Sequence, residues 1–169
     1  NAGASGVSYW NLLDQYYNRH GSYGEMQQLG LWKYLKSAYI SEPNVYKKIQ
    51  TDYEVRPQYY AYSLLTRFIR QGDTVYPLSL GDEHIAGSAF LNREGKWTYV
   101  LVNATDKDMY VSLENDKSGA DGTYDIYKYM EGRLPEGDAM IAPTEQTETK
   151  DHSIRLKLSR SSIRVLVQK

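Results

Sequence analysis

The stretch that most constrains the fold runs from Val55 to Pro77 and reads VRPQYYAYSLLTRFIRQGDTVYP. Apolar and aromatic side chains recur in it at intervals of three and four residues, which predicts an amphipathic helix. Pro57 stands where a first helical residue needs no amide donor, and Gly72 is a natural stop beyond the last turn. From Thr74 the spacing changes to that of a strand. The predicted apolar stripe consists of Tyr62, Leu65 and Ile69, with Tyr59 and Phe68 beside it.

The residues after this helix are predicted to form about seven antiparallel strands. Segments of alternating apolar and polar residues are separated by short turns that contain Gly, Asp or Asn. Because no helix is expected between them, the fold class is mainly β, an antiparallel β-sandwich. Residues 131–151 are polar with two prolines, and we expect a surface excursion with a short strand near 140–141 as an option. The expected strands cover 74–80, 84–92, 96–103, 109–113, 123–130, 154–158 and 163–167.

The residues before the helix are predicted to be mostly helix and loop. Gly6–Leu13 is short and apolar, which suits a buried strand, and residues 14–24 are typical of a loop. Helical spacing runs from Glu25 to Tyr39, and Ser41 is a candidate cap for a short helix that ends near Asp52. We therefore expect two domains, residues 1–72 and residues 73–169.

Composition excludes several classes of function. A net charge of −1 gives no reason to expect nucleic acid as a partner, and no apolar run reaches the ~20 residues of a membrane span. The absence of cysteine excludes disulfides and thiolate metal sites. An acidic loop with Asp116 and Asp121 fails the calcium-loop spacing, and no phosphate-binding or zinc-binding motif is present. We expect no bound metal and no cofactor.

Tyrosine is unusually abundant, with 17 residues. Tyrosine suits half-buried strands, but its flat ring and hydroxyl also suit contact with sugars. Trp97 and Tyr99 share one face of a strand, so they are either core residues or part of a sugar platform. A stand-alone carbohydrate-binding module is therefore one functional hypothesis, although fold alone supports it weakly. Asn103-Ala104-Thr105 fits the N-glycosylation sequon, which acts only in a eukaryotic secretory setting.

Three stretches, taken in order, resemble parts of one enzyme family. GVSYWNLLDQY, residues 6–16, resembles an eighth barrel strand that ends S-Y-W-x-L-x-D. RPQYYAYSLLTRFI, residues 56–69, resembles a closing barrel helix that begins K/R-P-x-Y-Y-A. Residues 97–113 and 156–167 resemble strands of a small trailing sandwich. Together these stretches resemble the C-terminal part of a retaining (β/α)8-barrel glycoside hydrolase.

The resemblance implies a substrate-binding role for three residues. Trp10 would match the aromatic residue that floors the sugar subsite at the scissile bond, since residues at the C-terminal end of a barrel strand face the active site. Trp10 as an ordinary core aromatic is the alternative. Asp14 and Tyr16 would begin the eighth loop on the same rim of the barrel.

The resemblance also implies that the catalytic residues are not in this chain. Retaining enzymes use an acid and a nucleophile about 5 Å apart, and the family places them on strands four and seven, ahead of Asn1. We therefore expect no catalytic residue, no hydrolysis by this chain alone, and a sandwich that braces the barrel of a parent enzyme. The expected partners are carbohydrate through the parent enzyme and the missing barrel portion. Residues 6–13 would lack a ladder partner, so we expect this segment either to be disordered or to pair elsewhere, with a second copy of the chain as one candidate.

Overall fold

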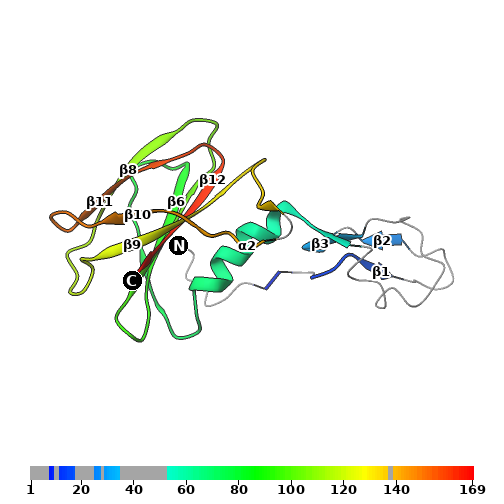
Figure 1. The fold of residues 1–169 in the computed structure, drawn as a ribbon, viewed down its shortest axis with the longest axis horizontal. Coiled ribbons are helices and arrows are strands. Elements are labelled where there is room, and N and C mark those ends of the chain that lie inside the picture. Colours follow the sequence, from blue (N-terminus) through cyan, green and yellow to red (C-terminus); the bar gives the residue numbers. More distant parts are fainter. Residues whose placement is uncertain (1–7, 10–11, 18–24, 28, 35–52, 137–138) are drawn as a thin grey trace. The chain divides into compact units, whose positions relative to one another are not determined.

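The computed structural model describes residues 8–9, 12–17, 25–27, 29–34, 53–136 and 139–169 (Figure 1). The chain divides into two compact units, residues 2–59 and residues 60–169. The division falls inside helix α2 (Pro57–Phe68). The domain boundary predicted after residue 72 stays a prediction.

The described residues from 74 onward form eight strands in two antiparallel sheets. The larger sheet has the order β10-β9-β12-β7-β6-β5, and β11 pairs with β8 in a second sheet of two strands. The predicted antiparallel β-sandwich is confirmed. The strands are β5 (Thr74–Pro77), β6 (Ile85–Leu91), β7 (Trp97–Asn103), β8 (Met109–Glu114), β9 (Thr123–Met130), β10 (Pro143–Glu148), β11 (Ser153–Leu158) and β12 (Ser162–Gln168).

The core lies between these two sheets. On β7, Trp97, Tyr99 and Leu101 point inward because alternate residues of a strand share a face, and each is at most 2% exposed. They pack in one cluster with side chains of the second sheet such as Leu113 and Ile154. The rings of Trp97 and Tyr99 lie 6.2 Å apart with an interplanar angle of 11°. Both aromatic residues are therefore core residues and cannot form a sugar platform.

The other face of the large sheet is covered by the C-terminal half of α2. Tyr127 and Val165 are buried on strands β9 and β12 but do not belong to the cluster between the sheets. The ring of Phe68 lies 4.5 Å from that of Tyr127, and Arg67 donates a hydrogen bond to the carbonyl of Ile141 at 3.0 Å. The sandwich thus gains a helical third layer.

Helix α2 begins at Pro57, as predicted, and ends at Phe68, before Gly72. Gly72 has a φ of 96°, which is the left-handed conformation that favours glycine. The fully buried helical residues are Tyr60 and Leu64, beside the stripe predicted from the sequence. Aromatic residues occupy several faces of this helix, so packing rather than spacing selects the buried row. The predicted stripe, Tyr62, Leu65 and Ile69, is half-buried, and so are Tyr59 and Phe68 beside it.

Short strands stand where the sequence predicts helix and loop in residues 2–59. They are β1 (Gln15–Tyr17), β2 (Glu25–Gln27), β3 (Trp32–Tyr34) and β4 (Tyr53–Val55), paired β1 with β2 and β3 with β4. The helix predicted over 25–39 is wrong in its described part, and the loop predicted over 14–24 is wrong at β1. Pairing with distant residues overrides a local helical spacing.

The remaining N-terminal predictions fall largely outside the described residues. These are the short helix over 41–52 and most of the strand over 6–13. Leu13, at the end of that predicted strand, makes an isolated parallel bridge to Trp32 of the same chain. This bridge joins the segment before β1 to β3.

The surface excursion predicted over 131–151 contains strand β10. This strand pairs with β9 at the edge of the large sheet, and a register shift follows Pro143. Most of its side chains are exposed. An edge strand that is solvated on both faces shows no alternation of apolar and polar residues, so the sequence gives no signal for it. Pro143 is compatible with such an edge.

Candidate functional site

The three residues predicted to bind substrate belong to the N-terminal unit. Trp10 lies outside the described residues. Tyr16 is the middle residue of β1 and pairs with Met26 of β2. Asp14 immediately precedes β1 and is 3% exposed. The substrate-binding role of all three stays a prediction.

Asp14 forms a buried ion pair with Arg56, the residue that precedes α2. Nη1 of Arg56 donates to Oδ1 of Asp14 at 2.5 Å, and Nη2 donates to Oδ2 at 2.9 Å. Arg56 Nη1 also donates to the carbonyl of Gly30 at 2.6 Å, while the amide of Gly30 donates to Asp14 Oδ1 at 2.9 Å. The side chains of Arg56 and Asp14 are 14% and 1% exposed. This two-pronged geometry is the strong form of a charge-assisted hydrogen bond.

The ion pair fastens three segments that are far apart in the sequence. A Cβ at Gly30 would come within 2.2 Å of the backbone nitrogen of Asp14, so only glycine fits there. The amide of Arg56 donates to the carbonyl of Leu31, and the amide of Asp14 donates to the carbonyl of Trp32. Asp14 is therefore an anchor for the chain just before β1, whatever further contacts it makes.

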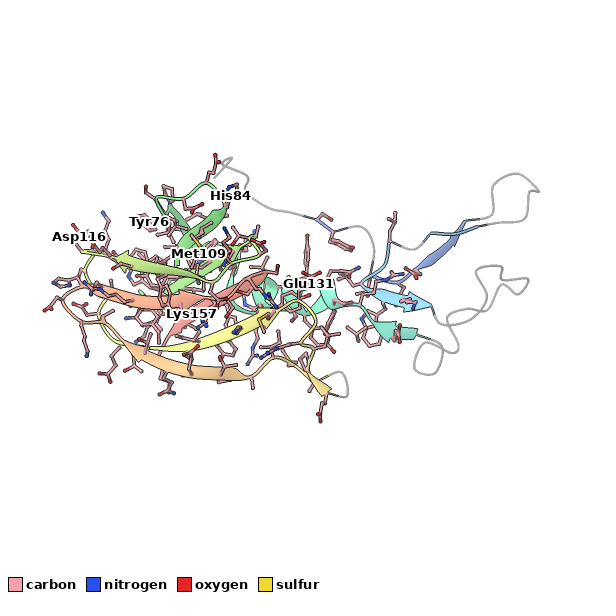
Figure 2. The ribbon with its side chains drawn as sticks, turned by 90° about the horizontal axis from the view of Figure 1, so that it is seen from above. Tyr76, His84, Met109, Asp116, Glu131 and Lys157 are labelled. Atoms are coloured by element: carbon pink, nitrogen blue, oxygen red, sulfur yellow. The ribbon has the colours of Figure 1, made fainter. Side chains whose placement is uncertain are left out.

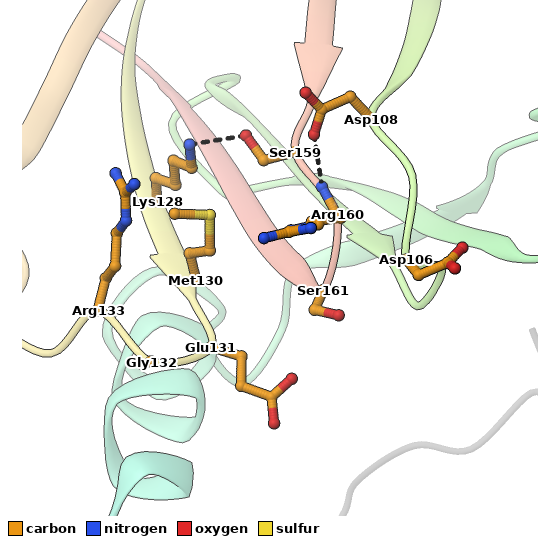
Figure 3. A pocket seen from close by; sticks show the side chains of 10 residues that line it. All are labelled: Asp106, Asp108, Lys128, Met130, Glu131, Gly132, Arg133, Ser159, Arg160 and Ser161. Carbon is orange, nitrogen blue, oxygen red and sulfur yellow. Dashed lines mark hydrogen bonds between the residues drawn. The ribbon is translucent and has the colours of Figure 1, made fainter.

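A groove of about 750 Å³ lies at one end of the sandwich, where three loops meet (Figure 3). We call it the loop-end groove. Three cations and three carboxylates line it, and its one apolar side chain belongs to Met130. Its residues are Asp106, Asp108, Lys128, Met130, Glu131, Gly132, Arg133, Ser159, Arg160 and Ser161.

Backbone hydrogen bonds through Ser161 hold the three loops together. The amide of Ser161 donates to the carbonyl of Thr105 at 2.9 Å, and the amide of Glu131 donates to the carbonyl of Ser161 at 3.1 Å. Ser161 has a φ of 42°, which is unusual for a residue with a side chain. The shape of the groove therefore depends on a backbone conformation that the surrounding bonds maintain.

Asn103 fixes two of these loops from below. Its Nδ2 donates to the carbonyls of Lys107, Leu158 and Ser159 at 2.8, 3.2 and 3.1 Å. Its Oδ1 accepts from the amide and the hydroxyl of Thr105. Asn103 is 1% exposed. The sequon at Asn103 is therefore inaccessible to glycosylation in the folded protein, and this asparagine has a structural role.

Two charged groups of the groove, Lys128 and Asp108, have a shifted pKa. Burial lowers the pKa of Lys128, and the neighbouring Arg164 and Arg133 lower it further. Lys128 donates to the hydroxyl of Ser159 at 2.7 Å. The hydrogen bond from Lys157 and that from the backbone amide of Arg160 lower the pKa of Asp108. Asp108 is therefore ionised at neutral pH and is a poor proton donor.

Behind the groove, Arg164 of β12 is a buried cation. It is 6% exposed, is paired in register with Lys128, and forms an ion pair with Glu145 of β10. Its Nε has no hydrogen-bond partner among the residues that the structure describes. The groove therefore offers donors and acceptors of both charges, but no aromatic ring, to a polar ligand.

Nothing in the sequence indicates this groove, because its residues come from three separate turns. Among the described residues, no group of three acidic or histidine side chains is placed to hold a metal ion. The described helix is too short and too polar to cross a membrane.

Comparison with known proteins shows a likeness in fold. No family model and no curated protein matches the sequence. The GH30 endoxylanase from Clostridium papyrosolvens C71 matches with a TM-score of 0.60 and 17% identity, over 78% of this chain and 32% of that chain. The catalytic domain of GH30 xylanase C from Talaromyces cellulolyticus gives 0.58 and 16%, over 83% and 27%. The endo-β1,6-glucanase BT3312 gives 0.53 and 15%, over 94% and 26%.

The chain thus spans between 26% and 32% of the length of these three structures. The predicted resemblance to part of a glycoside hydrolase is confirmed at the level of the fold. Proteins named as xylanases and as a β1,6-glucanase share this fold, so the fold does not select a substrate.

Proposed function

We propose that the chain is a non-catalytic C-terminal part of a glycoside hydrolase, in which the β-sandwich braces the catalytic barrel. One observation carries the proposal. The chain is covered over 78–94% by solved glycoside hydrolases but matches only 26–32% of their length. Such coverage is expected of one region of a larger enzyme, and the carbohydrate partner would then be bound through that enzyme.

The described residues support bracing over catalysis. Asp14, one of the two predicted polar site residues, has both carboxylate oxygens hydrogen-bonded to Arg56. In the loop-end groove, Asp108 is ionised, so it lacks the raised pKa that a glycosidase acid requires. Trp97 and Tyr99 are buried in one continuous core between the sheets, and such a packed domain is suited to support.

The test compares the chain with the full gene product that contains it. We expect the purified chain to release no reducing sugar from xylan or from β-1,6-glucan, and the full product to hydrolyse at least one glycan. Circular dichroism on the same samples confirms that the chain is folded. Steady hydrolysis by the folded chain alone would overturn the proposal, provided that the activity of each gel-filtration fraction is proportional to the concentration of the chain in that fraction.

A stand-alone carbohydrate-binding module remains the second candidate function, but its sugar-binding surface would consist of residues other than Trp97 and Tyr99. Trp97 and Tyr99 are each 2% exposed, so neither can stack on a sugar. The second sheet, however, presents the exposed ring of Tyr110. That ring favours a sugar-binding surface on the sandwich, whether or not a barrel accompanies it.

A further inference from the structure

The outer face of the β8–β11 sheet presents an aromatic ring to solvent. Tyr110 is 78% exposed, more than any other large hydrophobic side chain of the described residues. A single exposed ring needs no explanation by itself. Here, however, the ring borders a hollow of about 400 Å³, lined by Tyr110, Val111, Ser112, Arg155, Leu156 and Lys157.

The strand register places two cations beside this ring. Tyr110 lies opposite Lys157, and Arg155 lies opposite Ser112, one outward position along β11. Diagonal neighbours of this kind are about 7 Å apart. Figure 2 labels Lys157 on β11, beside Met109 at the start of β8. The alternate residues Leu113 and Ile154 point into the core. The outward side chains of these two strands, Tyr110 and Ser112 on β8 and Arg155 and Lys157 on β11, do not belong to that core.

The two cations differ in their partners. Lys157 pairs with Asp108 at 2.5 Å, so its charge is largely balanced. Arg155 forms no side-chain hydrogen bond or ion pair with any described residue, and neither cation is stacked on Tyr110. Glu114 lies opposite Ser153, so it is the other diagonal neighbour of Arg155, at about the same separation as Tyr110, but no ion pair joins Glu114 to Arg155. The cation next to the ring that has no ion-pair partner among the described residues is therefore the guanidinium of Arg155.

We infer that this face binds a polysaccharide segment that carries carboxylate groups, as in uronic acid residues. One sugar ring lies flat on Tyr110, and the carboxylate of the same or the next residue accepts two parallel hydrogen bonds from Arg155. The hydroxyl of Ser112, between them on β8, hydrogen-bonds to a sugar hydroxyl. A nucleic acid would require several free cations, which the face does not offer. This inference does not depend on the proposed bracing role; it rests on the second candidate, a sugar-binding surface at Tyr110, and names its ligand class.

The test is isothermal titration calorimetry of the whole chain with tetragalacturonate, and with xylotetraose as the neutral counterpart. We expect tetragalacturonate to bind about tenfold more tightly than xylotetraose, the gain of one charge-assisted pair. Tyr110→Ala should weaken tetragalacturonate binding about fivefold or more. Arg155→Gln should remove the preference for the acidic ligand. Lys150→Gln, at an exposed cation on the neighbouring turn, is the matched control and should leave binding unchanged.

Three results would overturn the inference. The first is the absence of heat with tetragalacturonate at millimolar concentration. The second is an equal loss of affinity in Lys150→Gln and Arg155→Gln, which would mean nonspecific attraction to any surface cation. The third is equal affinity of the unsubstituted chain for both ligands, which would mean a neutral sugar surface. Since Tyr110 and Arg155 are exposed, all variants should keep the melting temperature of the unsubstituted chain.

Discussion

The substitution Asn103→Asp tests whether one buried amide holds the loop end of the sandwich together. Aspartate has nearly the same size and keeps the oxygen that accepts from Thr105. It replaces the Nδ2 group, which donates to three carbonyls, with an oxygen that faces those carbonyls. The change therefore removes donors without creating a cavity.

The expected loss is large because all three bonds are buried or nearly so. Nδ2 carries two hydrogens, which the three carbonyls share, so at a net 0.5–1.5 kcal/mol for each hydrogen bond the group contributes about 1–3 kcal/mol. An ionised carboxylate without a cationic partner adds a desolvation penalty, which brings the total to about 4 kcal/mol or more near pH 7. Since a domain has about 5–15 kcal/mol of stability, the substitution should remove a large share.

The penalty should depend on pH in a defined direction. Burial among carbonyl oxygens raises the pKa of the new carboxyl above its unfolded value of about 3.9. The penalty is then fully present above the raised pKa and disappears as the pH falls below the unfolded value. A protonated carboxyl also regains one donor for a carbonyl.

Urea unfolding near pH 7 and again near pH 4.5 measures both effects. Asn92→Asp is the matched control, because Asn92 uses its Oδ1 to accept from the amides of Glu94 and Lys96, which aspartate can still do. The control should change stability by less than about 0.5 kcal/mol. A loss below about 1 kcal/mol in Asn103→Asp, or an equal loss at both pH values, would refute the reasoning.

Three further substitutions test other parts of the structure. Arg56→Leu leaves the carboxylate of Asp14 buried without its partner, and should cost about 3–5 kcal/mol of local stability, measured by hydrogen exchange in residues 25–34. Adding Asp14→Leu to this variant should restore most of the lost stability, and no recovery would argue against the ion pair. Leu64→Ala, at a residue that is 1% exposed, should cost about 2–5 kcal/mol in urea unfolding, and a cost below 1 kcal/mol would contradict its packing in the core. The carboxyl of Asp108 should titrate below its ordinary pKa in carbon NMR, and Lys157→Gln should raise the midpoint of that titration. An unmoved midpoint would refute the pairing. The stability that this pair contributes is present above the ordinary carboxyl pKa and is lost as the pH falls through the lowered value.

Local pattern predicts the C-terminal unit well because its strands bury one regular face. The alternation of Trp97, Tyr99 and Leu101 follows from that face. Helix α2 is predicted for a different reason: Pro57 is favoured at a first helical position, and helical spacing follows it. Pattern fails at β10 because an edge strand solvated on both sides has no apolar face to repeat.

The N-terminal unit is predicted less well because its organisation depends on contacts between distant residues. Trp32 lies in a helical spacing, but it pairs with Val55 in β3–β4 and bridges Leu13. The ion pair of Asp14 and Arg56 joins residues 42 positions apart. The sequence indicates neither contact, and it also leaves the loop-end groove undetected.

Along strands β9 and β12, the inward side chains change from apolar residues in the core to charged residues at the loop end. On β9 and β12, the inward residues Ile126 and Leu166 belong to the core, whereas the next inward positions toward the loop end are Lys128 and Arg164. A domain selected for stability alone would extend the apolar core there, because well-packed apolar residues often stabilise more than a buried ion pair. The charged positions instead keep the loop end polar and leave the core intact beneath it. Loop residues can then change without disturbing the core.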